Sequence, residues 1–522
     1  MFRYLAFFVL LFSFCLNLYK NNNELNEETL ILTIQLNNRQ QIIHGFGASD
    51  AWSTQFVGKN WPLEKRQEMA DLLFSSEMDA NGNPRGIGLS IWRFNIGGGS
   101  AEQGVESGIE DQWRRGESFL TADNTYDWNM QKGQQWFMDA AHARGVETFI
   151  GFANSPPVLL TRNGKAFGDG SAQANIAPAN YDTYADYLVR IVQYFDKKGT
   201  PLTFVSPVNE PQWNWSKSNG QEGSPYQNEE LVGIVTALDS KIREYDLDIQ
   251  IEIPETAQIN FLYTGDDPGR NNQTEYFFGS GSSVKNLPSL ARKMAAHSYF
   301  TTYPVKEMVN HRQQLWDNII RTDPELEYWM TEFCVLGDVG EGMRGNGRDL
   351  GIDPALYVAR VMHYDLTVAN ASSWQWWLGI SPYDYKDGLI YIDNDFYDGE
   401  FYVSKLLWGI GNFSRFIRPG AVRVEVDRSD QLTAVEYADG IMASAYFHEE
   451  DKDFIVVIIN YDQQSREIEV NMEEREYLIS NLTPYITHVD ANLEKQKSFA
   501  PGGRVLIPAR SIVTITGSSS DD

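Results

Sequence analysis

Two glutamates follow strand-like segments, where a carboxylate could take part in catalysis. The apolar run Leu202-Thr-Phe-Val-Ser-Pro-Val ends in Asn209-Glu210-Pro211, and the run Glu327-Tyr-Trp-Met-Thr ends in Glu332-Phe333. Two carboxyl groups roughly 5 Å apart can cleave a glycosidic bond with retention: one attacks the anomeric carbon, and the other protonates the leaving oxygen and then activates water. We therefore expect Glu210 and Glu332 to form a catalytic pair, although either residue alone could make a salt bridge or cap a helix.

Polar residues near other strand-like segments could support such a pair. Arg93, in Ser90-Ile-Trp-Arg-Phe-Asn-Ile, could hold the nucleophilic carboxylate ionised by a charge-assisted hydrogen bond, or could form a purely structural ion pair. Asn209 could bind the 2-hydroxyl of the sugar. In Ala296-His-Ser-Tyr, Tyr299 could orient the nucleophile or bond a backbone carbonyl, and His297 is a further candidate for substrate binding.

Tryptophans near the same segments are candidates for contacts with a sugar. The run Ser373-Trp-Gln-Trp-Trp-Leu places Trp374 and Trp376 on one face of a strand, because strand side chains alternate. One of them could form the floor of a sugar subsite, or both could pack in the core. Trp213, which follows Glu210, is a further candidate platform, as are Trp52, Trp128 and Trp215.

Other kinds of catalytic site lack their sequence signatures. The chain has no C-x-x-C pair, no H-E-x-x-H and no other dense spacing of metal ligands, so we predict no transition-metal site. Gly97-Gly98-Gly99 does not have the spacing of a nucleotide-binding loop, and we expect it to let a loop pass close to the ligand. The G-x-S-x-G motif of serine hydrolases is also missing.

Eight short β-rich segments alternate with helical segments, which predicts an α/β fold of the (β/α)8 barrel type. The strand segments are residues 42–47, 89–96, 147–153, 203–208, 249–254, 294–299, 327–331 and 373–377, and the clearest helical segments are 62–75, 127–145, 181–198, 229–245, 305–320 and 355–370. A barrel closes a parallel sheet without an exposed edge, and an open doubly wound sheet is the alternative. Glu210 and Glu332 then follow the fourth and seventh strands, whose C-terminal ends meet at one rim.

Outside the predicted barrel, residues 39–420, the hydrophobic pattern has a period of two. Runs such as Val422-Arg-Val-Glu-Val and Phe454-Ile-Val-Val-Ile-Ile-Asn predict a β-sandwich domain over residues 421–517. An early strand, Leu30–Leu36 within residues 28–38, would have no partner in the barrel. We expect it to pair with the C-terminal sheet.

Composition restricts the class of protein and its partners. Of 522 residues, 42% are hydrophobic and 22% are charged, which excludes a largely disordered chain. The net charge of −28 disfavours nucleic acids and anionic membrane surfaces as partners. Of the two cysteines, Cys15 lies in the N-terminal apolar segment and Cys334 would remain alone in the mature chain, so we expect no internal disulfide.

The N-terminal segment, residues 1–20, is typical of a secretory signal peptide. Arg3 precedes an apolar run that ends before the polar residues Lys20 to Glu24. An uncleaved anchor is the alternative, but the run is shorter than the roughly 20 residues that span a bilayer. We therefore expect a secreted, periplasmic or cell-surface protein with no stable membrane association after removal of the signal.

Several motifs together resemble those of one enzyme family. They are His44-Gly-Phe-Gly-Ala-Ser, Trp92-Arg-Phe-Asn-Ile-Gly-Gly-Gly, Asn154-Ser-Pro-Pro, Val208-Asn-Glu-Pro, Thr331-Glu-Phe and Gly411-Asn-Phe-Ser-Arg-Phe-Ile-Arg-Pro-Gly. With these motifs the chain resembles glycoside hydrolase family 30, whose members are retaining β-glycosidases. The Asn-Glu-Pro motif is shared across a wider clan, whereas the last motif is more specific to this family.

This resemblance implies a barrel fused to a side β-domain built from both ends of the chain. It also implies Glu210 as acid/base and Glu332 as nucleophile, with Arg93, Asn209 and Tyr299 in support and no cofactor. Asn154, from the Asn154-Ser-Pro-Pro motif, joins the candidate substrate-binding residues. The chain departs from the family pattern at Val158, where members often have a tryptophan.

The resemblance also suggests the substrate, a polysaccharide or oligosaccharide. The Ile-Gly-Gly-Gly stretch at residues 96–99 favours a branch similar to endo-β-1,6-galactanases. Endo-xylanase and exo-acting β-glycosidase are the alternatives within the family. A carbohydrate-binding protein that has lost catalysis is the alternative from another class.

Overall fold

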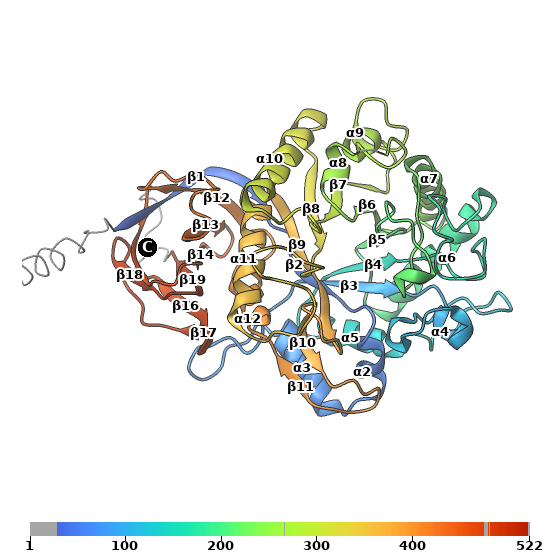
Figure 1. The fold of residues 1–522 in the computed structure, drawn as a ribbon, viewed down its shortest axis with the longest axis horizontal. Coiled ribbons are helices and arrows are strands. Elements are labelled where there is room, and N and C mark those ends of the chain that lie inside the picture. Colours follow the sequence, from blue (N-terminus) through green and yellow to red (C-terminus); the bar gives the residue numbers. More distant parts are fainter. Residues whose placement is uncertain (1–28, 266, 474–478, 480, 520–522) are drawn as a thin grey trace, which may run out of the picture.

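The computed structural model describes residues 29–265, 267–473, 479 and 481–519. The predicted signal segment, residues 1–20, lies outside this part of the chain. Two sheets organise the described residues: a barrel surrounded by helices and, beside it, a curled sheet of mostly antiparallel strands (Figure 1). The predicted fold class, a (β/α)8 barrel with a side β-domain, is confirmed.

Eight parallel strands close the barrel. They are β2 (Gly45–Ser49), β3 (Ile91–Ile96), β4 (Thr148–Ala153), β5 (Phe204–Ser206), β6 (Gln250–Thr256), β7 (Leu290–His297), β8 (Glu327–Glu332) and β9 (Ala371–Ser381). Each strand pairs with the next, and β9 pairs with both β8 and β2, which completes the ring. Every residue of β3 and β9 is buried, because helices cover the outside of the barrel and side chains fill its interior.

Strand β9 is longer than its neighbours and continues beyond the ring. Its C-terminal half pairs with β10 (Gly388–Ile392), which in turn pairs with β11 (Phe401–Val403). Between β2 and β9 the register shifts: Ala48 is opposite Trp376 and Ser49 is opposite Leu378, so Trp377 is an extra residue. Such a bulge changes the direction of the side chains beside it.

Helices fill the connections between the barrel strands. They are α2 (Thr54–Asn60), α3 (Leu63–Phe74), α4 (Ser100–Gln103), α5 (Lys132–His142), α6 (Tyr181–Lys198), α7 (Asn228–Glu244), α8 (Asn260–Tyr263), α9 (Gln273–Phe278), α10 (Val305–Thr322), α11 (Ile352–Thr367) and α12 (Lys405–Ser414). Helix α6 ends where Gly199 adopts a left-handed conformation with a φ of 90° and donates its N–H to the carbonyl of Phe195. At the start of α7, Gln227 and Glu230 form a capping box.

The β-domain is one curled sheet of nine strands. They are β1 (Leu30–Ile42), β12 (Val422–Arg428), β13 (Ile441–His448), β14 (Asp453–Asn460), β15 (Arg466–Met472), β16 (Thr483–His488), β17 (Ala491–Lys495), β18 (Arg504–Ile507) and β19 (Ser511–Ser518). The N-terminal strand β1 lies beside β12 (Figure 1) and pairs with it in the antiparallel direction, and on its other edge it pairs with β15 in the parallel direction. The expected pairing of Leu30–Leu36 with the C-terminal sheet is therefore confirmed. Alternate residues Leu32, Ile34 and Leu36 point into an apolar cluster enclosed by the curl.

Two barrel helices hold the β-domain against the barrel. In α12, the side-chain amide of Asn412 donates to Oγ1 of Thr514 in β19 at 2.9 Å, and that hydroxyl donates to the carbonyl of Asn412 at 2.6 Å. In α11, buried Arg360 pairs with Asp439 at 3.1 Å. Among the described residues, no helix has both the length and the apolar character needed to span a bilayer.

Candidate active site

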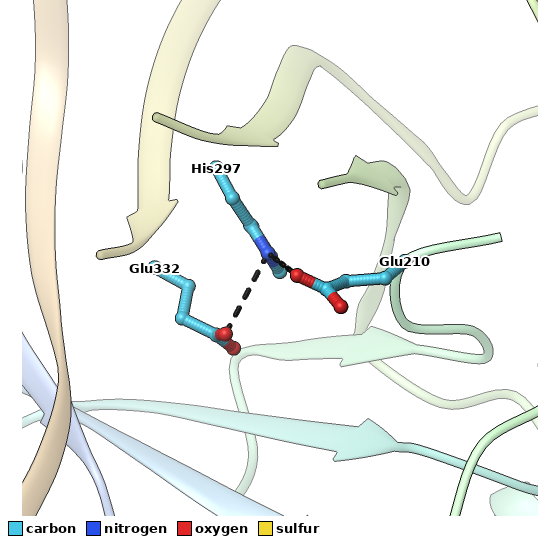
Figure 2. A group of neighbouring side chains, drawn as sticks. All are labelled: Glu210, His297 and Glu332. Carbon is cyan, nitrogen blue, oxygen red and sulfur yellow. Dashed lines mark hydrogen bonds and ion pairs between the residues drawn. The ribbon is translucent and has the colours of Figure 1, made fainter. Parts of the chain in front are cut away.

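The C-terminal ends of the barrel strands bring the predicted catalytic residues together. Glu210 follows β5, His297 is the last residue of β7 and Glu332 is the last residue of β8. Figure 2 shows the imidazole of His297 between the two carboxylates. One oxygen of Glu210, one nitrogen of His297 and one oxygen of Glu332 all lie within 4.8 Å of one another. At this separation the two carboxyl groups can act on a carbon atom and on the oxygen bonded to it.

The carboxylate of Glu332 is held by two donors. Arg93, in β3, donates from Nη1 to Oε2 at 2.9 Å, and the hydroxyl of Tyr299 donates to Oε1 at 3.0 Å. Arg93 is fully buried and stacks over the ring of Phe152, with 4.1 Å between the guanidinium carbon and the ring centroid. Both oxygens of Glu332 are therefore fixed, and one of them forms a charge-assisted hydrogen bond with a guanidinium.

Glu210 has a different environment from Glu332. Burial raises the pKa of the Glu210 carboxyl above its ordinary value, and the charge of Glu332 adds to this effect, whereas the hydrogen bond from His297 opposes it. Its backbone has a φ of 46°, in the left-handed region, and its N–H donates to the carbonyl oxygen of Glu255 at 2.9 Å. The carbonyl of Glu210 accepts from Nε1 of Trp215 at 3.0 Å. A buried carboxyl with a raised pKa is suited to donate a proton.

His297 connects the two catalytic carboxylates with a third one. Its Nδ1 lies 3.1 Å from Glu210 and 3.6 Å from Glu332, and its Nε2 lies 2.9 Å from Glu255. Burial favours the neutral ring, but the charges of Glu332, Glu210 and Glu255 outweigh burial and raise the pKa of His297 to about 10. Near neutral pH the ring is therefore an imidazolium whose two N–H groups both donate.

The same three side chains lie close enough to bind a metal ion. A histidine binds a metal through a nitrogen lone pair, so the ring must first lose a proton. Because the pKa of His297 is raised to about 10, that proton is retained near neutral pH. The charge of Arg93, bonded to Glu332, also disfavours a cation at this place. The donor set does not fit a resident metal.

A cavity of about 350 Å³ opens above the carboxylates. It is lined by Asn209, Glu210, Trp213, Trp215, Asn219, Gln221, Tyr299, Phe300, Glu332, Cys334, Leu336 and Trp377. Trp213 packs edge-on against Phe300, with 6.1 Å between the ring centroids. Aromatic faces and polar side chains around a pair of carboxylates suit the binding of a sugar ring.

Trp374 and Trp376 lie on one face of β9, as strand alternation predicts, and their rings stack with 6.3 Å between the centroids. Both are fully buried, and their ring nitrogens donate to the carboxylate of Asp365 at 2.9 Å and the carbonyl of Asp387 at 2.7 Å. Neither residue lines the cavity, so both pack in the core, which was the alternative to a sugar-binding floor. Trp377, the extra residue of the bulge, is the tryptophan of β9 that lines the cavity.

Asn209 and Asn154 follow strands β5 and β4, and each has a buried side-chain atom without a hydrogen-bond partner among the described residues. Asn209 lines the cavity, and its buried Oδ1 accepts no hydrogen bond from the described residues. Asn154, which follows β4, is buried, and neither polar atom of its side chain has a partner in the described part of the chain. Buried amide groups without partners are costly, so Asn209, which lines the cavity, is poised to bond a ligand. Asn154 does not line the cavity.

The Gly97-Gly98-Gly99 loop packs closely against neighbouring loops of the protein. A Cβ on Gly97 would lie 2.4 Å from the carbonyl oxygen of Glu117, and one on Gly98 would lie 3.2 Å from that of Pro156. The buried carboxylate of Glu222 accepts hydrogen bonds from the N–H groups of Gly98 at 2.7 Å and Ser100 at 3.1 Å. The glycines therefore allow two loops to pack closely beside the site.

Sequence reasoning missed Glu255 among the residues of this site. Its carboxylate bonds both Arg93, at 3.4 Å, and His297. Glu255 lies near the C-terminal end of β6, in Ile251-Glu-Ile-Pro-Glu-Thr. A carboxylate at the end of a barrel strand was the signal that identified Glu210 and Glu332, and the same signal applies to Glu255.

Comparison with known proteins gives a family match and named relatives. The family model described as O-Glycosyl hydrolase family 30 matches residues 29–391, more than half of the chain. The chain is 23% identical over 380 residues to an endo-beta-1,6-galactanase from Hypocrea rufa, covering 70% of each protein. It is 26% identical over 179 residues to an exo-beta-1,6-galactobiohydrolase from Bifidobacterium longum subsp. longum, covering 28% of this chain and 12% of that protein.

A solved structure resembles the chain over nearly its whole length. It is described as a conserved exported protein from Bacteroides fragilis. The two chains are 33% identical, the TM-score is 0.87, and the similarity covers 93% of this chain and 100% of the other.

Proposed function

The chain belongs to O-glycosyl hydrolase family 30 and is a glycoside hydrolase, and on that premise we propose that it is an exported endo-β-1,6-galactanase acting by double displacement. The mechanistic part rests on one observation. Glu332 accepts hydrogen bonds from Arg93 and Tyr299 on its two oxygens, whereas burial raises the pKa of Glu210 on the other side of the His297 ring. Different environments of two nearby carboxyls assign them different roles.

In the first step, an oxygen of Glu332 attacks the anomeric carbon of the sugar. The bond to the leaving oxygen breaks, and that oxygen takes the proton from Glu210. Arg93 and Tyr299 each donate a hydrogen bond to Glu332, and together they fix the orientation of its carboxylate for this attack. The products of this step are a glycosyl ester on Glu332 and a free sugar hydroxyl.

In the second step, Glu210 has lost its proton and acts as the base. It takes a proton from water, whose oxygen bonds to the anomeric carbon while the ester bond to Glu332 breaks. The imidazolium of His297, 3.1 Å from Glu210, stabilises the carboxylate form that this step needs. Two inversions at the same carbon retain the β configuration.

Neighbouring side chains provide contacts for the sugar. We assign Asn209 to the 2-hydroxyl, because it lies beside the acid/base and its buried Oδ1 is available. Asn154 is assigned to a second sugar hydroxyl because neither polar atom of its side chain has a partner among the described residues. Trp213, together with Trp377, provides an aromatic wall of the cavity.

The substrate and the cellular location rest on the relatives and on the N-terminal sequence. Both relatives described above are named for β-1,6-linked galactose. Export is supported by the signal-like segment at residues 1–20 and by the description of the Bacteroides fragilis protein as exported.

Product analysis tests this proposal. The purified enzyme is incubated with β-1,6-galactan, glucuronoxylan, β-1,6-glucan and short aryl β-glycosides, and the products are separated by size. We expect a ladder of galacto-oligosaccharides whose newly formed reducing ends are first observed as the β anomer by proton NMR. Galactose or one short oligosaccharide alone would indicate exo action, and a ladder from glucuronoxylan would identify a xylanase. Saturable binding without new reducing ends would contradict catalysis, and an initial α anomer would contradict double displacement.

A further inference from the structure

The carboxylate of Glu255 lies behind the catalytic pair, where side chains from three strands meet. Its Oε2 accepts from the hydroxyl of Thr331 at 2.8 Å, is 2.9 Å from Nε2 of His297, and accepts from Nη2 of Arg93 at 3.4 Å. The side chain is fully buried and lies one residue before the end of β6. It is too deep to belong to the residues that line the cavity.

Glu255 contacts the acid/base by a second route, through the backbone. The carbonyl oxygen of Glu255 accepts the N–H of Glu210 at 2.9 Å. Both residues have left-handed backbones, with φ of 55° for Glu255 and 46° for Glu210. Such conformations cost about 1 kcal/mol or more for residues other than glycine, so surrounding contacts must hold them in place.

Resting on the acid/base and nucleophile roles proposed above, we propose that Glu255 is the positioning residue of the acid/base Glu210. Its carbonyl fixes the Glu210 backbone, and its carboxylate fixes the His297 ring that bonds the Glu210 side chain. Glu255 therefore acts on Glu210 in two places. One contact holds the backbone of Glu210, and the other, through His297, holds its carboxyl group. Glu255 does not touch the substrate, and its effect passes through the neighbouring residues.

The charge of Glu255 also balances the cations beside it. The groups that face His297 are the carboxylates of Glu210, Glu255 and Glu332 and the ring of Tyr299, and Arg93 lies across Glu255 and Glu332. Removing the charge of Glu255 takes away one of the anions that balance the two buried cations, Arg93 and the imidazolium of His297. The protonated form of His297 is then less stable relative to the neutral ring.

Glu255→Gln tests the proposal because it keeps the shape of the side chain and removes its charge. The substrates are 2,4-dinitrophenyl and phenyl β-glycosides of β-1,6-galactobiose. A dinitrophenolate leaves without a proton, so its kcat/KM, which reports the first step, should stay within about threefold of the wild type. Phenol needs the acid, and its kcat/KM should fall by about 10- to 100-fold, the usual range for a residue that orients a catalytic group.

Asp239→Asn is the control, because it removes a buried carboxylate that does not contact the site. Asp239 is fully buried in α7, and its carboxylate accepts from Nε of Arg243 at 2.9 Å and from the N–H of Ser289 at 3.1 Å. We expect the ratio of the two kcat/KM values to stay at the wild-type level in this variant. An equal loss with both substrates in Glu255→Gln, or the same change of ratio in Asp239→Asn, would overturn the proposal.

The protonation of His297 provides a readout that does not depend on the substrate. In ¹⁵N NMR of the histidine rings, assigned with a His297→Gln variant, we expect the wild-type His297 to be an imidazolium at about pH 7. In Glu255→Gln its titration midpoint should fall by about one pH unit or more. A neutral His297 in the wild type would overturn the proposal even if Glu255→Gln does not fold. A wild-type enzyme that cleaves none of the glycosides would instead contradict the proposed function.

Discussion

Arg93 and Glu332 form an ion pair across the barrel, with 2.9 Å between Nη1 and Oε2 and both side chains almost completely removed from solvent. The pair joins β3 to β8, which are not neighbours in the ring. In such surroundings, an ion that loses its partner is left with an uncompensated charge. The same contact that orients the nucleophile therefore also contributes to the stability of the barrel.

Replacing Arg93 by methionine should lower both stability and activity. The substitution removes the guanidinium that pairs with the carboxylates of both Glu332 and Glu255, so we expect the free energy of unfolding to fall by about 3–5 kcal/mol in urea denaturation. Arg292→Met is the control, because Arg292 is exposed and pairs with Asp323 at the surface, and its loss should cost about 0–1 kcal/mol. Equal losses in the two variants would argue against the buried pair.

The two catalytic glutamates should be distinguished by azide. Glu332→Ala should remain folded and lose essentially all hydrolysis of the polymer. With an activated aryl glycoside, azide can occupy the space left by the carboxylate and attack the sugar directly, which yields the inverted α-glycosyl azide.

Glu210→Ala should give the opposite configuration under the same conditions. The glycosyl ester on Glu332 still forms from an activated substrate, and azide then displaces it to give the β-glycosyl azide. NMR of the isolated azides checks both expectations. The same anomer from both variants would contradict the assigned roles.

Two tryptophans should behave differently when they are replaced by alanine. Trp213 is only partly buried at the cavity, so its loss should lower kcat/KM for the polymer by about 3- to 10-fold, which corresponds to an aromatic contact of about 1 kcal/mol. Trp374 is fully buried, and Trp374→Ala should lower the free energy of unfolding by about 3–5 kcal/mol. Kinetics and urea denaturation of both variants test this, and a greater loss of stability in Trp213→Ala would contradict it.

The alkaline limb of the kcat/KM profile should report the protonated form of Glu210. Burial raises the pKa of Glu210 and the hydrogen bond from His297 lowers it, so His297→Gln should move this limb to higher pH. His311→Gln is the control, because His311 bonds the hydroxyl of Tyr263, away from the site. A limb that stays in place or moves to lower pH in His297→Gln would contradict the proposed coupling.

Acid should destabilise the contact between the barrel and the β-domain through His363. Burial, helped by the charges of Arg428 and Arg423, lowers the pKa of this α11 side chain to about 3. Because the folded pKa lies below the ordinary value, the stabilisation is present above about pH 6.5 and is lost as pH falls towards 3, by at most about 1.4 kcal/mol per pH unit. In urea denaturation between about pH 4 and 7, the free energy of unfolding should change less with pH in His363→Gln than in the wild type. An equal slope in the two proteins would contradict this role.

The fold was predictable because its signals are local. Each barrel strand is a short apolar run followed by a polar turn, and α6 has a glycine at its C-terminal end. The partner of β1 was predictable for a different reason: an alternating strand before the barrel had no place within it. Glu210 and Glu332 were predictable because the ends of parallel strands share one rim.

Other features of the site could not be predicted, because they depend on local backbone geometry that the spacing of apolar residues does not specify. One extra residue at Trp377 changes which tryptophan of β9 meets the cavity. The contacts of Glu255 depend on a left-handed backbone at its own position. The close packing of Gly97 depends on Glu117, which comes from a later part of the same loop.

The position of β1 has a consequence for biogenesis. This strand is synthesised before the barrel, but its two neighbours, β12 and β15, begin about 400 residues later in the sequence. A nascent chain therefore cannot complete the β-domain until the whole barrel has been synthesised. Until then both hydrogen-bonding edges of β1 lack the strands with which they pair in the folded protein.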